Sequence, residues 1–165
     1  MAQLTYSVDM PIAFAGLLAD NATRKDTLSR SSEEATSFPH GVAVVAGTDP
    51  DTQALLPTGA ADLLGVAQHS HANEVGGDDQ NLVDEGKMFN VLHEGRIFVE
   101  VEEAVTPASP VFVRISAGAG GSQLGAFRAS ADTATALQAS GARFLTSAGA
   151  GEFAVLEIDA GAAIA

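Results

Sequence analysis

The chain has 165 residues, 46% of them apolar, and its 21 acidic against 8 basic residues leave a formal net charge of −13 at pH 7. One globular domain with its own core is the default at this length, and so acidic a surface disfavours nucleic-acid binding, which requires clustered Lys and Arg. The sequence contains no cysteine, which excludes disulfides, thiolate metal sites and cysteine nucleophiles.

Residues 10–19, MPIAFAGLLA, form an apolar stretch that ends in small residues, as the core of a signal peptide does. Asp9 precedes the stretch and no Lys or Arg does, whereas the start of a secretory signal is positively charged. The stretch is also shorter than the ~20 apolar residues of a membrane-spanning helix. We therefore interpret it as structural and expect no membrane partner.

Residues 20–40 are polar and rich in Ser and Thr, and they lack the hydrophobic periodicity of either a strand or a helix, which predicts an extended arm or a long loop. Residues 1–40 hold five acidic and three basic side chains, a net of −2, so residues 41–165 carry the other −11. This change in character divides the chain into an N-terminal arm, residues 1–39, and a β domain, residues 40–165.

Short apolar runs alternate with turn residues after Pro39. Their β-branched and alternating patterns predict strands at residues 41–47, 63–71, 87–93, 97–102, 111–116, 126–130 and 133–139, and a closing hairpin at residues 142–158. Strands spaced by roughly 8 to 12 residues favour an all-β fold, here a small β-barrel or β-sandwich with an extended N-terminal arm.

Residues 132–141 also fit a short helix, with Asp132 as its N-cap and Gly141 as its C-terminal stop. This interpretation competes with the strand predicted over residues 133–139. The pattern alone leaves both open.

The strands predicted over residues 97–102 and 111–116 suggest a contact face. If they pair, Arg114 lies across from a glutamate and Phe98 lies near Phe112 on the same face. A polar face that carries two phenylalanines is a candidate contact surface. The alternative is that loops of the domain cover both rings.

Two histidines are the strongest local candidates for metal ligands. His69 and His71 point the same way on a strand and could bind a metal with Glu74 or His93. No third and fourth ligand lies at a tight spacing, so solvent-facing or hydrogen-bonded histidines are the favoured interpretation. We expect no metal.

The sequence matches no catalytic template. The acidic loops at residues 49–51 and 76–86 lack the ligand order of a calcium loop, and no G-x-S-x-G elbow places a serine beside a base. Glu102 and Glu103 are sequence neighbours, which point to opposite faces in a regular strand, and the glycines of residues 116–121 fit no phosphate-binding motif. We expect no cofactor and no enzymatic activity.

The run GKMFNVLHEGRIFVEVEEAVTPASPVFVR, with LLGVA upstream and LGAFRASADTATA and ARFLTSA downstream, resembles the capsid cement, or decoration, proteins of tailed bacteriophages. The opening MPIAFAGLLADNATRKDTLSRSSEEATSFPHG is similar to the N-terminal portion of that family. The resemblance therefore covers nearly the whole chain and has no catalytic motif at its centre.

This resemblance implies a non-enzymatic virion protein that lies on the outer face of the head, binds the major capsid protein and cements neighbouring subunits, commonly as a homotrimer. It implies no cofactor. Composition and pattern suggest which side chains make the contacts. The candidates for capsid binding are Phe14, Leu17, Leu18, Arg24, Lys25, Leu28 and Arg30, and those for subunit contact are Phe98 and Phe112.

Two other classes of function are considered. A carbohydrate- or receptor-binding module of a virion or cell surface could use the face with Phe98, Phe112 and the histidine pair. The chain has one Tyr and no Trp, and sugar platforms usually stack on such rings, which counts against it. A small hydrolase with a site assembled from distant residues has no support in the spacing.

Overall fold

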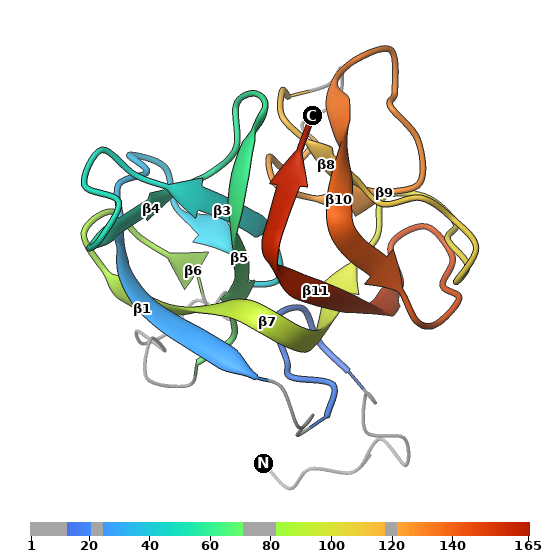
Figure 1. The fold of residues 1–165 in the computed structure, drawn as a ribbon, viewed down its shortest axis with the longest axis horizontal. Coiled ribbons are helices and arrows are strands. Elements are labelled where there is room, and N and C mark those ends of the chain that lie inside the picture. Colours follow the sequence, from blue (N-terminus) through green and yellow to red (C-terminus); the bar gives the residue numbers. More distant parts are fainter. Residues whose placement is uncertain (1–12, 21–24, 71–81, 118–121) are drawn as a thin grey trace, which may run out of the picture.

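The computed structural model describes residues 13–20, 25–70, 82–117 and 122–165. Within these ranges the chain forms strands and turns but no helix, and hence no helix able to span a membrane. The prediction of an all-β fold is confirmed (Figure 1).

Each range predicted as a strand contains or overlaps an observed one. The first strands are β1 (Asp26–Ser32), β2 (Phe38–Pro39), β3 (Ala43–Ala46), β4 (Gln53–Leu55), β5 (Ala61–Gln68) and β6 (Leu82–Val83). The later ones are β7 (Met88–Glu100), β8 (Phe112–Arg114), β9 (Phe127–Arg128), β10 (Ala136–Phe144) and β11 (Phe153–Ile164). The predicted closing hairpin is the pair β10 and β11.

Nine strands form one sheet, in the order β1-β4-β3-β5-β7-β11-β10-β8-β9, while β2 and β6 pair separately. β1 pairs with both β4 and β7, so β1, β4, β3, β5 and β7 form a closed ring, seen on the left of Figure 1. Closure of a sheet removes its free edges. Of the two predicted architectures, the ring therefore supports a small barrel.

Strand β7 is the longest element, and it connects the two halves of the sheet. Its first part pairs with β1 and β5 and its last part with β11. Ile97 and Val99 are fully buried while Phe98 is half-buried and Glu100 exposed, as the alternating pattern predicts. The two strands predicted at residues 87–93 and 97–102 are one continuous strand.

The core consists of two clusters of buried side chains that meet at β7. Phe89 and Val91 of β7 belong to one cluster, in which Phe89 packs edge-to-face against Phe38 with ring centroids 5.6 Å apart. Leu92 and Ile97 belong to the larger cluster. Because β7 contributes side chains to both clusters, its placement couples the packing of the two halves.

The pairing considered for residues 97–102 and residues 111–116 does not form. Strands β11 and β10 lie between β7 and β8 in the sheet, and Phe98 lies opposite Val155. The long apolar strand β11 offers β7 more pairing than the three-residue β8 does. In the segment between β7 and β8, Val105 instead bridges to Ala148, in the loop between β10 and β11.

The interpretation of residues 20–40 as an arm or long loop is also wrong where the structure describes them, because they contain β1 and β2. β1 carries mostly polar side chains and so lacks a hydrophobic pattern. Its backbone pairs with β7 from Asp26 to Ser31. Backbone hydrogen bonds to two neighbouring strands place it in the ring, which a search for hydrophobic periodicity does not detect.

Gly65 of β5 allows β5 and β7 to approach closely. It has a φ of 151°, and a Cβ there would lie far inside contact distance of the Leu92 carbonyl oxygen. We expect Gly65→Ala to lower the free energy of unfolding by about 2 to 4 kcal/mol, through strain and displacement of β7. Urea unfolding followed by circular dichroism measures this change.

Gly59→Ala is the matched control, since a Cβ at that loop position meets nothing within 4 Å. We expect its effect to stay within about 0.5 kcal/mol. Equal stability of the two variants would contradict the close approach of β5 and β7.

Candidate functional site

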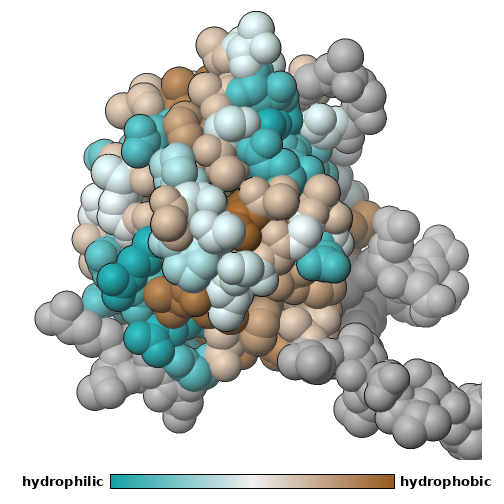
Figure 2. Space-filling view, turned by 90° about the vertical axis from the view of Figure 1, so that its right-hand side faces the viewer, coloured by the Kyte–Doolittle hydropathy of each residue, from teal (hydrophilic) through white to brown (hydrophobic). Residues whose placement is uncertain are grey.

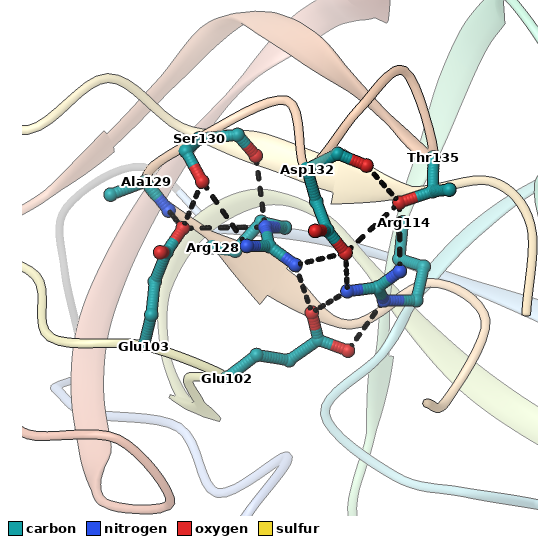
Figure 3. Close-up of polar contacts among 8 residues, drawn as sticks. All are labelled: Glu102, Glu103, Arg114, Arg128, Ala129, Ser130, Asp132 and Thr135. Carbon is teal, nitrogen blue, oxygen red and sulfur yellow. Dashed lines mark hydrogen bonds and ion pairs between the residues drawn. The ribbon is translucent and has the colours of Figure 1, made fainter. Parts of the chain in front are cut away.

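Two buried arginines form the centre of the most highly connected polar cluster among the described residues. Arg114 on β8 and Arg128 on β9 are 2% and 8% exposed. Arg114 donates two parallel hydrogen bonds to Glu102, from Nε to Oε1 at 2.7 Å and from Nη2 to Oε2 at 2.6 Å (Figure 3). Such bidentate, charge-assisted pairs are the strongest hydrogen bonds between side chains.

Arg128 shares its carboxylate partners with Arg114. Its Nη1 donates to Glu102 Oε2 and to Asp132 Oδ2, both at 3.0 Å. Arg114 Nη2 also donates to Asp132 Oδ2, at 2.8 Å. Each of these two carboxylates therefore neutralises both guanidinium groups, as Figure 3 shows.

Glu103 completes the cluster from the other side of Arg128. It lies 3.3 Å from Arg128 Nε and accepts hydrogen bonds from the Ala129 amide and the Ser130 hydroxyl. Glu102 and Glu103 were predicted to point to opposite faces of a strand. Both instead reach Arg128, because β7 ends at Glu100 and the chain bends after it.

The turn that carries Asp132 has an unusual backbone. Asp132, Thr133 and Ala134 have φ values of 44°, 56° and 67°, a left-handed conformation that costs residues other than glycine free energy. The Thr135 hydroxyl donates to the Asp132 carbonyl oxygen at 2.7 Å. The ion pairs of the Asp132 carboxylate thus hold a strained turn in place. β10 follows it, so the strand interpretation is correct and the helix interpretation wrong.

The hydrogen bonds of the cluster shift the pKa values of its acids. Donation by Arg114, and then by Thr135, lowers the pKa of Asp132. Burial on its own would raise the pKa of Glu103, but hydrogen bonds from Ser130 and Ala129 and the charge of Arg128 outweigh it and lower that pKa. The hydrogen bond to Glu102 raises the pKa of Arg114. All these side chains are therefore charged at neutral pH.

The cluster is suited to holding structure. Arg114 and Arg128 each make four hydrogen bonds to protein atoms, which uses most of the donors of a guanidinium. Arginine does not titrate in proteins, and the lowered pKa values of Asp132 and Glu103 keep these two carboxyl groups ionised near neutral pH. The geometry therefore describes a rigid clamp that joins β8, β9, the left-handed turn and the end of β7.

A hollow of about 490 Å³ lies beside this clamp. Arg114, Arg128 and Glu102 contribute to its lining, together with apolar walls and the exposed carboxylate of Glu100. A second, more open hollow adjoins it and shares His40 and other residues with it. The remaining residues that line the second hollow include Phe14, His69 and Leu82.

The structure places the described members of the predicted capsid-binding set on two stretches beside β7. Leu18 bridges to Ile97, and the neighbouring backbone exchanges hydrogen bonds with Phe98. Phe14, in the same stretch, packs edge-to-face on the His69 ring, with centroids 4.4 Å apart. Leu17 is half-buried. These residues thus pack partly against the protein itself.

The other members of that set lie on or before β1. Leu28 and Arg30 are half-buried on the strand, and Lys25 is exposed just before it. Arg24 lies outside the described residues. The two phenylalanines predicted for subunit contact, Phe98 and Phe112, are half-buried on strands that are not neighbours.

The histidines that the structure describes do not assemble as a metal site would require. His69 lies against His40, with ring centroids 5.3 Å apart, while His93 Nδ1 is 2.7 Å from the Leu64 carbonyl oxygen. His71 and Glu74 lie outside the described residues. Among the residues that are described, no cluster of His, Asp and Glu could hold a metal.

Sequence reasoning identified part of the clamp. The expectation that Arg114 faces a glutamate is met by Glu102, although the contact arises without the predicted strand pairing. Sequence reasoning did not identify Arg128 and Asp132 as members of the clamp. A charged residue at a strand position flanked by apolar residues, as in AFRA around Arg128, is the signal that could have marked a buried cation.

Removal of one clamp arginine should destabilise the protein strongly. Arg114→Gln leaves Glu102 and Asp132 with Arg128 alone, and an uncompensated charge in a buried pair costs about 3 to 5 kcal/mol. Arg143→Gln is the control, because that arginine pairs with Glu157 while its side chain is 68% exposed, and such pairs contribute about 1 kcal/mol or less. Urea unfolding measures the free energy of unfolding of both variants. Equal losses of stability in Arg114→Gln and Arg143→Gln would contradict the role of the clamp.

Acid should weaken the clamp. Because the folded-state pKa values of Asp132 and Glu103 lie below their ordinary values of 3.8 and 4.5, their stabilisation is complete above the ordinary values and is lost as pH falls from there through the folded-state pKa values. We expect the melting temperature to fall more between pH 6 and pH 3, roughly the range over which carboxyl groups titrate, in the wild type than in Asp132→Asn. Parallel curves would assign the acid sensitivity to other carboxylates.

Comparison with solved structures finds a similar fold in a phage capsid. A chain in the structure titled "The capsid of Myoviridae Phage XM1" aligns with a TM-score of 0.66 and 17% identity, over 96% of this chain and 95% of that one. A chain of the head fibre gp8.5 N base of bacteriophage phi29 aligns with a TM-score of 0.43 and 10% identity, over 82% of this chain and 95% of that one, a likeness too low to bear on the fold.

Sequence comparison assigns the family. No curated protein matches the chain. The family model described as "Structural cement protein (E217 gp24/Pam3 gp6)" matches residues 2–159, which is nearly the whole chain rather than a single motif. The chain therefore belongs to the family of phage structural cement proteins, and it is a structural protein of the virion that lies on the capsid and binds capsid subunits.

Proposed function

We propose that this protein acts on the outer face of the phage head, where it bridges neighbouring major capsid protein subunits and stabilises the shell without catalysing a reaction. The observation that carries this proposal is a stiff body, in which a closed ring of strands forms one half and the Arg114 and Arg128 clamp secures the other. Family membership supplies the partner, a capsid subunit.

The proposed mechanism is mechanical. Packaged DNA strains the shell, and a protein that contacts two or more subunits adds contact area across their seams. A specific protein interface usually buries about 1,600 Å² in total, and the symmetry of a capsid repeats each contact over the shell. A stiff body transmits load between its contacts, which a closed, clamped sheet does better than a loop-rich domain.

The charge distribution supports a position away from the packaged DNA. Five basic residues among those described pair with carboxylates of the same chain, namely Lys87, Arg96, Arg114, Arg128 and Arg143. Most of the cations are thus neutralised within the chain, in which acidic residues exceed basic ones by 13. Such a body is repelled by DNA and tolerated on the outer surface.

The capsid-facing residues of this proposal are those predicted from the sequence, whose described members flank β7. Partial exposure suits the described members, since a contact residue needs both a fixed position and accessible surface. On the face shown in Figure 2, apolar patches are set among hydrophilic side chains, a mixture typical of the surfaces that form non-obligate interfaces. The full set is Phe14, Leu17, Leu18, Arg24, Lys25, Leu28 and Arg30.

Self-association as a homotrimer is the second part of the proposal. The core relies on small apolar side chains, with 8 Phe, 1 Tyr and no Trp in the whole chain. Burial of further surface between copies would add stability at ~25 cal/mol per Å². Phe98 and Phe112, both half-buried, are the proposed contacts between copies.

Binding to undecorated phage heads tests the proposal. We expect the purified protein to cosediment with emptied heads, saturably and at a fixed ratio to the major capsid protein, and to have the mass of a trimer in solution. Lys25→Glu should bind more weakly, whereas Lys87→Glu, which changes a lysine already paired with Asp84, should not. Absence of binding together with a monomeric mass would overturn the proposal and favour a receptor-binding module.

A further inference from the structure

The hollow of about 490 Å³ beside the clamp has the size and lining of a binding site. Val42, Val101 and Ala126 contribute apolar wall, while Arg114 and Glu102 contribute charge. Because the clamp bonds occupy most of the guanidinium donors, the arginines have little capacity left to bind an anion. The chemistry of a ligand must therefore be decided by the other groups around the hollow.

Two carboxylates and two guanidinium groups line the hollow. Glu102 is paired with Arg114 and Arg128, which Asp132 and Glu103 neutralise further, so the carboxylate of Glu100 stays outside the clamp. Glu100 is the least compensated of these acids. It is exposed at the end of β7, lines the hollow, and makes no ion pair with any residue that the structure describes. A cation is the complementary ligand.

An aromatic ring stands beside this carboxylate. Phe153, the first residue of β11, lies directly opposite Glu100 in the antiparallel register, and such partners point to the same face of a sheet. Phe153 is 37% exposed and is one of the two large hydrophobic side chains exposed among the described residues. A carboxylate next to an accessible ring binds lysine and arginine by charge and by the cation–π interaction.

We propose that this hollow receives a basic side chain, lysine or arginine, of the major capsid protein. The methylene stem lies along Val42, Val101 and Ala126, and the charged end meets Glu100 and the ring of Phe153. This inference rests on the proposed function, since it assumes the capsid partner. A second copy of this chain is the weaker alternative, because most of its described basic side chains are already paired.

The test compares three variants in the cosedimentation assay with emptied heads. Glu100→Gln keeps the shape and removes the charge, and we expect it to weaken binding about tenfold and to reduce the salt dependence of binding. Phe153→Leu keeps an apolar side chain without the ring, and a smaller loss in the same direction is expected. Asp159→Asn removes one exposed charge of β11 away from the hollow and should leave binding unchanged.

The outcomes separate this inference from the function on which it rests. Failure of the wild type to bind heads would overturn the proposed function. Wild-type binding that Glu100→Gln leaves intact, or that Asp159→Asn weakens equally, would overturn only the basic-side-chain site. Loss of the oligomeric mass in Glu100→Gln with unchanged binding to heads would assign the hollow to a second copy. Melting curves of all variants confirm that they are folded, as their exposed positions lead us to expect.

Discussion

The structure depends on the neutralisation of two buried guanidinium groups. Arg114 and Arg128 lie on strands of only three and two residues, which make few backbone pairings with the rest of the sheet. Their shared carboxylates come from the end of β7 and from the turn before β10. The requirement that no charge stay buried without a partner thus joins elements far apart in the sequence, and it also sustains the left-handed turn at Asp132.

Strand β7 plays the complementary role for the backbone. It pairs with β1, β5 and β11 in turn and contributes side chains to both core clusters. The ring closed by β1 removes edges that could pair with other chains, and the clamp secures the opposite half. A body built in this way resists deformation in both halves, which suits the proposed bridging of capsid subunits.

The position and the charge of Glu100 link this framework to the proposed capsid contact. Glu100 is the residue at which β7 ends, so the proposed capsid contact lies at the junction of the sheet, the clamp and the hollow. The stretches that carry Leu18 and Leu28 lie along the same strand. Contacts made through these residues would load β7 directly, and the strand would pass that load to both clusters of the core.

The sequence by itself determined the all-β class, most strand positions, the closing hairpin and the family, because alternation, turn residues and extended similarity are local or linear properties. Only the tertiary structure decided which strands pair. It pairs residues 95–100 of β7 with β11, and it includes β1 in the sheet. Pairing depends on which strands compete for an edge, and a polar strand such as β1 shows no hydrophobic pattern. The sequence pattern indicated one member of the clamp, Arg114. Asp132 pairs with Arg114 and Arg128 only because folding brings the turn that carries it against these two buried cations.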